Sequence, residues 1–288
     1  MPKKWIILDC NYLCHRAKYS TGELSYKGSA TGVVYGFLKA VTYLLEKFDS
    51  PNIVFCWDSK TSKRKQICPS YKKSRENPHE GKSKKEIAFD IEFRKQMKML
   101  RKVYLKKIGY RNVFCQKGME GDDIIASVCL NLKTEEEAVI VTADKDMYQL
   151  IKGNVSVYNP AKNKMITLQN FYKEYGILPR LWITVKCFAG CSADEVKGIQ
   201  GVGEVTALKW LRGLLKPNLK IAQRIKKEGE DITNKNYPLV ALPFEGTKIF
   251  KLKKDRLSEK GWEEVMKRLG LTSLRDKAPF IRKRKYNK

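Results

Sequence analysis

The stretch that decides the fold is GMEGDDIIAS at residues 118–127, which places Glu120, Asp122 and Asp123 within four positions. The chain around it is strongly basic, with 58 Lys and Arg against 31 Asp and Glu and a formal net charge of +27. Two like unit charges about 4 Å apart repel by roughly 4 kcal/mol at an effective dielectric constant near 20. Carboxylates crowded in this way need a compensating positive charge close by.

The composition describes a globular protein with a basic surface. Of its 288 residues, 42% are hydrophobic and 10% are aromatic, which is enough for a sizeable core. The positive charge exceeds what solubility requires and indicates a polyanionic partner. Nucleic acid fits best, because neutralising phosphates releases counterions. An anionic membrane is disfavoured, because no basic amphipathic helix stands out.

Cysteine and histidine usage argues against a zinc site. The eight cysteines lie mostly in apolar runs and form no CxxC pair, and the chain has two histidines, His15 and His79. The N-terminus MPKKWIILDC is not a signal peptide, because Asp9 interrupts its apolar run, and no apolar run approaches 18 residues. We expect a soluble, intracellular protein with no membrane association.

Short apolar runs alternate with helical patterns along the first half of the chain. Strands are expected at 5–8, 52–57, 112–115 and 138–143, and helices at 31–48, 91–109 and 122–132. This alternation predicts an α/β protein with a parallel sheet and crossover helices.

Acidic residues follow each of these predicted strands. They are Asp9, Asp58, Glu120, Asp122, Asp123, Asp144 and Asp146. Any one of them has a simpler explanation, such as a helix N-terminus or a turn. Because the carboxyl ends of parallel strands share one edge, however, all are expected to converge there. Oxygen ligands without imidazole or thiolate suit Mg²⁺ or Mn²⁺, and a pair of such ions can hydrolyse a phosphodiester.

A basic segment begins directly after Asp58. Residues 59–107 hold 17 Lys and Arg against five Asp and Glu. Arg64, Lys72 and Arg75 are expected to grip phosphates, and Tyr71 to stack on a base. The alternative is a solvated loop.

A glycine-rich turn lies between two helical patterns at 190–211. Gly198, Gly201 and Gly203 follow another acid, Asp194. Glycines let backbone N–H groups approach a phosphate, although helix hairpins also use them simply to turn. Further on, residues 261–271 predict an amphipathic helix and 275–288 a basic tail that is disordered or lies on nucleic acid.

Together these motifs resemble the 5′ nuclease family, which includes the 5′→3′ exonuclease domain of bacterial DNA polymerases of the first type and the phage flap endonucleases. The matching stretches are IILDCNYLCHRA, GSATGVVYGFL, VFCWDSKTSKRKQICPSYKKSR, GMEGDDIIA, VTADKDMYQL and GIQGVGEVTA. They occur in order over residues 5–212, and the match continues more loosely to about 270.

The resemblance implies a resolvase- or PIN-like nuclease core at 1–160 with a helical arch at about 59–95. A helical duplex-binding domain at 161–288 follows, with a helix–three-turn–helix hairpin at 190–211 and a basic tail. The implied activity is structure-specific, Mg²⁺-dependent hydrolysis at DNA 5′ ends and 5′ flaps, for primer or flap removal in replication or repair. Mn²⁺ is expected to substitute for Mg²⁺, and K⁺ to bind at the hairpin.

The resemblance also assigns residues and partners. The implied metal ligands are Asp9, Asp58, Glu120, Asp122, Asp123, Asp144, Asp146 and Asp194. The implied catalytic residues are Arg64, Tyr71, Lys72 and Arg75, and the implied DNA contacts are Lys72, Arg75, Gly198, Gly201 and Gly203. DNA with 5′ ends, flaps or nicks is the expected partner, with RNA primer–DNA hybrids as a further substrate. The protein is expected to be a monomer working beside a separate polymerase.

One position departs from the family pattern. Where the family shows GDSSDN, this chain reads GCSADE, so that Cys191 stands for an Asp and Glu195 for the Asn. This puts the second metal site in question. Two other functions therefore stay open: a DNA-junction-binding protein with weak cleavage, and a PIN-type ribonuclease.

Overall fold

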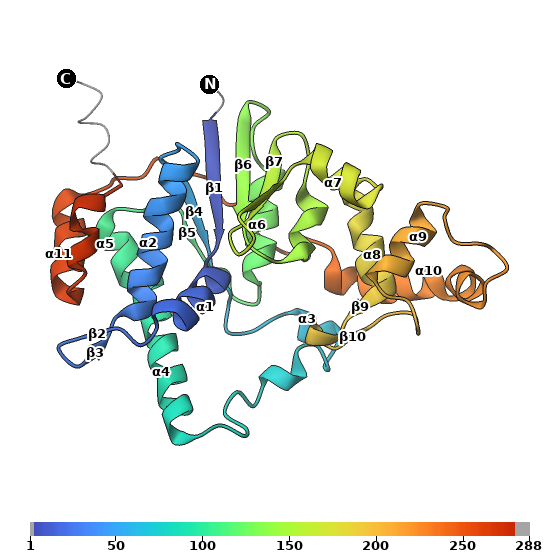
Figure 1. The fold of residues 1–288 in the computed structure, drawn as a ribbon, viewed down its shortest axis with the longest axis horizontal. Helices are drawn as coiled ribbons and strands as arrows, with labels where there is room; N and C mark the ends of the chain where they lie inside the picture. Colours follow the sequence, from blue (N-terminus) through green and yellow to red (C-terminus); the bar gives the residue numbers. More distant parts are fainter. Residues whose placement is uncertain (1–2, 280–288) are drawn as a thin grey trace.

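A six-stranded sheet forms the centre of the molecule, and five of its strands run parallel (Figure 1). The computed structural model describes residues 3–279. In spatial order the strands are β5 (Val113–Phe114), β4 (Asn52–Cys56), β1 (Lys3–Asp9), β6 (Glu136–Val141), β7 (Val155–Asn159) and β8 (Lys164–Ile166). The four strands expected from the sequence are confirmed. The sheet is mixed rather than purely parallel, because β8 folds back antiparallel to β7.

Both faces of the sheet are buried, which explains why its central strands read as continuous apolar runs. In β1, Ile6 and Leu8 face one core and Trp5 and Ile7 face the other. The first core is covered by α1 (Cys10–Thr21), α2 (Gly32–Lys47), α5 (Leu105–Ile108) and α11 (Glu259–Leu269). The second is covered by α6 (Gly121–Leu130), α7 (Leu168–Tyr175), α8 (Trp182–Ala189), α9 (Glu204–Leu211) and α10 (Lys220–Val240).

The basic segment after β4 crosses the carboxyl edge of the sheet before it turns into a long helix (Figure 1). It contains the short helix α3 (Arg64–Ile67) and the 3₁₀ turn η1 (Lys73–Arg75), followed by α4 (Lys84–Met99). A capping box formed by Ser83 and Glu86 begins α4. A π-helical stretch, η2 (Leu100–Tyr104), joins α4 to α5. The expected arch is therefore helical at its two ends and irregular between them.

The C-terminal region returns to the first half of the molecule. After α10 the chain runs beside β5 and α6, where Asn112 and Ser127 side chains donate to the carbonyls of Lys253 and Lys248. Helix α11 then packs against α5 in the first core. These residues pack against the part of the chain before residue 160, although the expected division places them in the domain that begins at 161. The apolar faces of α5 and α11 pack against each other, and the sequence does not reveal this pairing. The packing accounts for the difference.

The remaining elements are short. They are the hairpin β2 (Ser25–Tyr26) and β3 (Ser29–Ala30), the hairpin β9 (Gly190–Cys191) and β10 (Val196–Lys197), and the 3₁₀ turns η3 (Lys145–Leu150), η4 (Pro179–Leu181), η5 (Ser192–Asp194) and η6 (Thr272–Lys277). The first residues of the expected basic tail form η6, and the rest of that tail, from 280 on, lies outside the described residues. Within residues 3–279, no helix combines the length and apolarity needed to cross a bilayer.

Candidate metal centre and catalytic pocket

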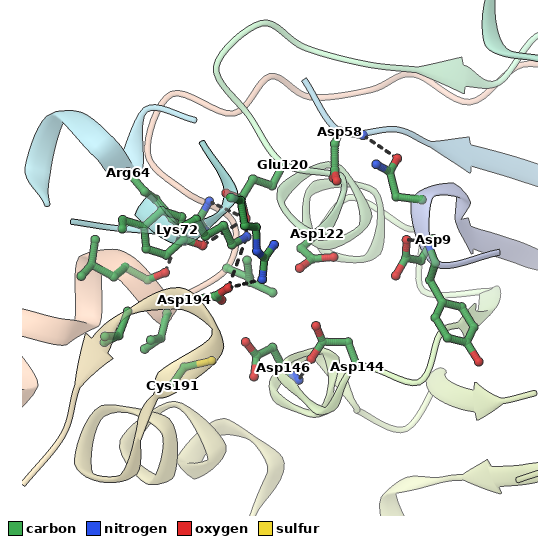
Figure 2. Close-up of a pocket in the computed structure, with 18 of the residues that line it drawn as sticks. Asp9, Asp58, Arg64, Lys72, Glu120, Asp122, Asp144, Asp146, Cys191 and Asp194 are labelled. Carbon is green, nitrogen blue, oxygen red and sulfur yellow. Dashed lines mark hydrogen bonds and ion pairs between the residues drawn. The ribbon is translucent and has the colours of Figure 1, made fainter. Parts of the chain in front are cut away.

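Seven carboxylates line one pocket of about 230 Å³ at the carboxyl edge of the sheet (Figure 2). They are Asp9, Asp58, Glu120, Asp122, Asp144, Asp146 and Asp194. Asp9 ends β1, Asp58 follows β4, Asp144 follows β6, and Glu120 and Asp122 lie at the start of α6. The convergence expected from the strand ends is therefore present for these side chains.

Local hydrogen bonds orient several of these acids. Asp9 caps α1 by accepting from the Tyr12 backbone N–H at 2.9 Å, and its second oxygen accepts from the Thr142 hydroxyl at 2.9 Å. Asp58 accepts from the Gly121 N–H at 2.6 Å. Asp144 caps η3 by accepting from the Asp146 N–H at 2.8 Å. Each carboxylate keeps lone pairs that face the pocket, since one or two bonds do not exhaust its acceptors.

The crowding of these groups disfavours their ionised forms. Burial, with smaller contributions from Asp58 and Asp144, raises the pKa of Asp9 to about 7. Burial and then the charges of Asp9 and Asp144 raise the pKa of Asp122 well above its ordinary value. Burial and Asp144 also raise the pKa of Asp146. Such shifts mark a site whose negative charge requires a cation.

The donor set fits hydrated divalent cations. Within residues 3–279, no three His, Cys, Asp or Glu side chains already lie close enough to hold an ion directly. The pocket, however, has room for several waters at about 30 Å³ each. Mg²⁺ characteristically keeps part of its water shell and takes one or two carboxylates. Oxygen ligands around a hydrated space therefore suit Mg²⁺ or Mn²⁺ better than a transition metal that needs close nitrogen or sulfur ligands.

Two cationic side chains of the arch enter the same pocket. Lys72 Nζ lies 2.7 Å from Glu120 Oε2 and 3.9 Å from Asp194 Oδ1. Arg75 Nη2 lies 2.7 Å from Asp194 Oδ1. Although burial opposes the ionised form, Lys72 and Arg64 outweigh it and lower the pKa of Glu120. Lys72 and Arg75 thus sit where they can meet a phosphate next to the carboxylates.

Comparison with known proteins identifies the family. Residues 4–176, more than half of the chain, match the family described as 5′-3′ exonuclease, N-terminal resolvase-like domain. The chain belongs to the 5′-3′ exonuclease family. The 5′-3′ exonuclease of Mycoplasmopsis pulmonis is 31% identical over 205 residues, which are 70% of this chain and 64% of that protein. The 5′-3′ exonuclease of Buchnera aphidicola is 32% identical over 214 residues, which are 73% of this chain and 70% of that protein. The thermostable DNA polymerase I of Thermus thermophilus is 29% identical over 233 residues, which are 79% of this chain and 26% of that protein.

Two solved structures share the fold of this chain. The bacteriophage T5 5′-exonuclease with divalent zinc ions superimposes with a TM-score of 0.70 at 18% identity, covering 96% of this chain and 97% of that one. The T5 flap endonuclease in a complex with DNA and metal ions gives a TM-score of 0.69 at 19% identity, covering 84% and 90%. At this level of identity the likeness establishes the fold alone.

Two predicted site residues instead form a buried ion pair. Asp123 has no exposed surface and does not line the pocket. Its two oxygens accept from Arg64 Nη1 at 2.8 Å and Nη2 at 2.7 Å, while Arg64 Nε donates to the Leu239 carbonyl. Asp123 is therefore corrected from a metal ligand to the partner of Arg64, whereas Arg64 itself lines the pocket with its guanidinium held by Asp123. Adjacent positions on a helix point about 100° apart, and here Asp122 faces the pocket while Asp123 faces Arg64.

The expectation that Tyr71 stacks on a base is also corrected. Its side chain is 3% exposed, and its hydroxyl donates to Glu120 Oε2 at 3.1 Å. The ring packs in the second core, so no face is free for a base. Tyr71 instead helps to hold Glu120 at the pocket edge.

The glycine segment follows α8 as expected and leads into α9, with the β9–β10 hairpin and η5 between them. A side chain at Gly198 would meet the Phe188 carbonyl at 2.3 Å, and Gly201 has a φ of +81°. These two glycines are needed for the turn itself. Gly203 has an extended backbone and no atom within 4 Å of a Cβ placed on it, so its surface is open.

Three residues of the site escaped sequence reasoning. The buried Lys186 places its Nζ 2.9 Å from Asp146 Oδ1, and the Thr142 hydroxyl contacts Asp9. Glu195, which appeared only as a departure from the family pattern, reaches across to the arch and accepts from the Lys73 and Ser74 backbone N–H groups. No signal marks Lys186 or Thr142, because both lie in ordinary apolar surroundings in the sequence.

Proposed function

We propose that this chain is a structure-specific 5′ nuclease that hydrolyses phosphodiester bonds at DNA 5′ ends and 5′ flaps. The observation that carries the proposal is one pocket lined by seven carboxylates and entered by Lys72 and Arg75 from a basic arch. A DNA-binding role without catalysis has no use for so many carboxylates at the point where phosphate must approach, because they repel it. The name of the T5 flap endonuclease, whose fold is shared, supports the same substrate.

The metal ligands proposed are the seven pocket carboxylates, with Asp123 removed from the expected set. Divalent cations held there, Mg²⁺ or Mn²⁺, supply the positive charge that activates water and stabilises the leaving oxygen. Without cations, the carboxylates keep a phosphate out. Lys72 and Arg75 then contribute hydrogen bonds and charge to the phosphate on the arch side.

The rest of the substrate is assigned to two surfaces. The basic arch attracts a single-stranded 5′ end through its charge. Gly203 and the start of α9 approach duplex phosphates through backbone N–H groups, as a helix–three-turn–helix hairpin would, with K⁺ as an aid to that contact. RNA primer–DNA hybrids carry the same phosphate charges along their backbone and are included as substrates. The polymerase relatives support a role beside a DNA polymerase. The chain is proposed to act there as a monomer.

The test is cleavage of a labelled 5′-flap DNA, its RNA counterpart and a plain duplex, with Mg²⁺ and with EDTA. Cleavage of the DNA flap with Mg²⁺ alone supports the proposal, whereas preferred cleavage of single-stranded RNA supports the ribonuclease alternative. Asp122→Ala and Asp144→Ala are expected to abolish cleavage and retain flap binding, because removal of a carboxylate lowers the repulsion of phosphate. Glu263→Ala, an exposed acid of α11 outside the pocket, is the matched control. Equal loss of binding and cleavage in the two aspartate variants contradicts the catalytic assignment.

The arch needs a separate test, because a solvated loop would leave chemistry unchanged. Lys72→Ala is expected to slow single-turnover cleavage of the flap far more than it weakens duplex affinity. An unchanged single-turnover rate removes Lys72 from the proposed catalytic residues.

A further inference from the structure

The loop that carries Asp194 touches the turn that carries Lys72. Glu195 Oε2 accepts from the Lys73 backbone N–H at 2.6 Å, and Oε1 accepts from the Ser74 N–H at 2.8 Å. The Lys72 N–H donates to the Asp194 carbonyl at 3.1 Å, and Arg75 Nη2 donates to Asp194 Oδ1 at 2.7 Å. We call this contact between residues 72–75 and 191–195 the arch clasp.

The backbone on both sides of the arch clasp is in an unfavourable conformation. Glu195 has a φ of +55° and Lys72 a φ of +52°, the left-handed region that side chains other than Gly, Asn and Asp seldom adopt. Such strain persists only where surrounding contacts over-determine it, and it concentrates at functional sites. Glutamate is a poor choice for this backbone when compared with Asn, but its longer carboxylate reaches the arch.

We propose that Glu195 is a positioning residue that holds the arch closed and so seats the Lys72 ammonium over the catalytic pocket. Through the arch clasp, Glu195 fixes the backbone of Lys73. The residue before it, Lys72, then places its Nζ 2.7 Å from Glu120 Oε2. The effect on catalysis rests on the proposed function. The closure of the arch does not, because it is a property of the free protein.

The two halves of the arch clasp respond differently to cations. Asp194 lines the pocket, so a divalent cation competes there with Arg75 and Lys72. Glu195 does not line the pocket, and its oxygens are directed at backbone N–H groups of the arch. The Glu195 half therefore stays in place when cations bind, and it keeps the arch over the pocket while Lys72 and Arg75 become free to meet phosphate.

Limited trypsin digestion tests the closure directly. Lys72, Lys73 and Arg75 are cleavage sites inside the arch clasp, and a bound turn resists the protease. In EDTA and again in Mg²⁺, Glu195→Ala is expected to be cut at these sites about tenfold faster than wild type, because two charge-assisted hydrogen bonds are lost. Glu195→Gln keeps one accepting oxygen and is expected to lie between them.

Glu76→Ala is the matched control, since Glu76 is an acid of the same segment that pairs with Lys65 rather than with residues 191–195. It removes the same charge and is expected to leave cleavage after Lys72 and Lys73 unchanged. Cleavage after Arg75 is left out of this comparison, because Glu76 directly follows that bond. A Tm within a degree or two of wild type for all three variants shows that the difference in digestion rate is local. Equal digestion of Glu195→Ala and Glu76→Ala overturns the arch clasp.

Single-turnover cleavage of a 5′-flap DNA tests the positioning. Glu195→Ala is expected to lower the rate about tenfold with little change in the Kd for the duplex, and Glu195→Gln to recover part of the rate. Faster digestion with an unchanged cleavage rate overturns the positioning of Lys72. An inactive wild-type protein with the expected digestion pattern overturns the proposed function and supports the arch clasp.

Discussion

Asp122 and Asp123 are adjacent in the sequence, yet the structure predicts that their neutralisation has opposite effects on stability. Asp123 accepts four hydrogen bonds: two from Arg64, one from the Glu120 N–H at 2.9 Å and one from the Phe244 N–H at 2.8 Å. Asp122 faces the other pocket acids and has a raised pKa, first through burial and then through Asp9 and Asp144. The perturbations to compare are Asp123→Asn and Asp122→Asn, which keep the shape of each side chain.

The expected cost of Asp123→Asn follows from the burial of its partner. The Arg64 side chain is 3% exposed, so the substitution leaves a buried guanidinium with Glu120, at 4.0 Å, as its remaining carboxylate partner. Breaking a buried ion pair in this way costs about 3–5 kcal/mol. For a chain of this size that corresponds to a loss of roughly 10 °C in Tm. A double variant, Arg64→Met with Asp123→Leu, is expected to recover part of the loss, because no charge is left buried.

Asp122→Asn is expected to raise the stability of the metal-free protein at neutral pH. The folded-state pKa of Asp122 lies above its unfolded value, so ionisation at neutral pH disfavours the native state. Removing the charge removes that penalty. The same substitution is expected to reduce the stabilisation that Mg²⁺ provides, because a ligand is lost.

Urea unfolding in EDTA and in Mg²⁺ is the assay, with the midpoint and slope recorded for wild type and each variant. A lower midpoint for Asp123→Asn and a higher one for Asp122→Asn in EDTA are the expected pair of results. If Asp123→Asn unfolds at the wild-type midpoint but loses its response to Mg²⁺, the ion pair is not its role. Asp123 then returns to the set of metal ligands.

Three further outcomes are expected. In EDTA, ionisation of Asp9 lowers the free energy of unfolding as pH rises from about 4 to 7, because its folded pKa of about 7 exceeds the ordinary 3.8. A pH series of urea midpoints checks this. Mg²⁺ should restore most of the lost stability near pH 8. Burial and then Asp194 raise the pKa of the Cys191 thiol, so the group stays neutral and binds Mg²⁺ poorly. Cys191→Asp should therefore lower the Mg²⁺ concentration for half-maximal flap cleavage, and an unshifted titration midpoint contradicts the reasoning. Gly203→Val should weaken duplex binding without changing Tm. Gly198→Val should lower Tm, because a side chain there meets the Phe188 carbonyl at 2.3 Å. Calorimetry measures Tm and a binding titration measures duplex affinity for both variants.

The four central strands and the acids at their ends were predictable because both are local properties of the sequence. A strand buried on both faces is a short apolar run, and the residue that follows it must lie at the carboxyl edge. Asp9, Asp58 and Asp144 were therefore assigned to one rim before any contact was known. The antiparallel β8 was missed, because a three-residue edge strand leaves too weak a pattern.

The tertiary structure decided which role each of several residues takes when those residues look alike in the sequence. Asp122 and Asp123 are both acids in the first turn of α6, and only the docking of Arg64, 59 positions away, turns one into a buried counter-ion. Tyr71 reads as an exposed aromatic in a basic loop, but the core covers it. In the sequence, Glu195 is only a departure from the Asn of the family pattern. In the structure its carboxylate accepts hydrogen bonds from Lys73 and Ser74, which lie 122 and 121 positions earlier. Periodicity along the chain records which side of an element is apolar, whereas the partner of a charge depends on which distant elements pack together.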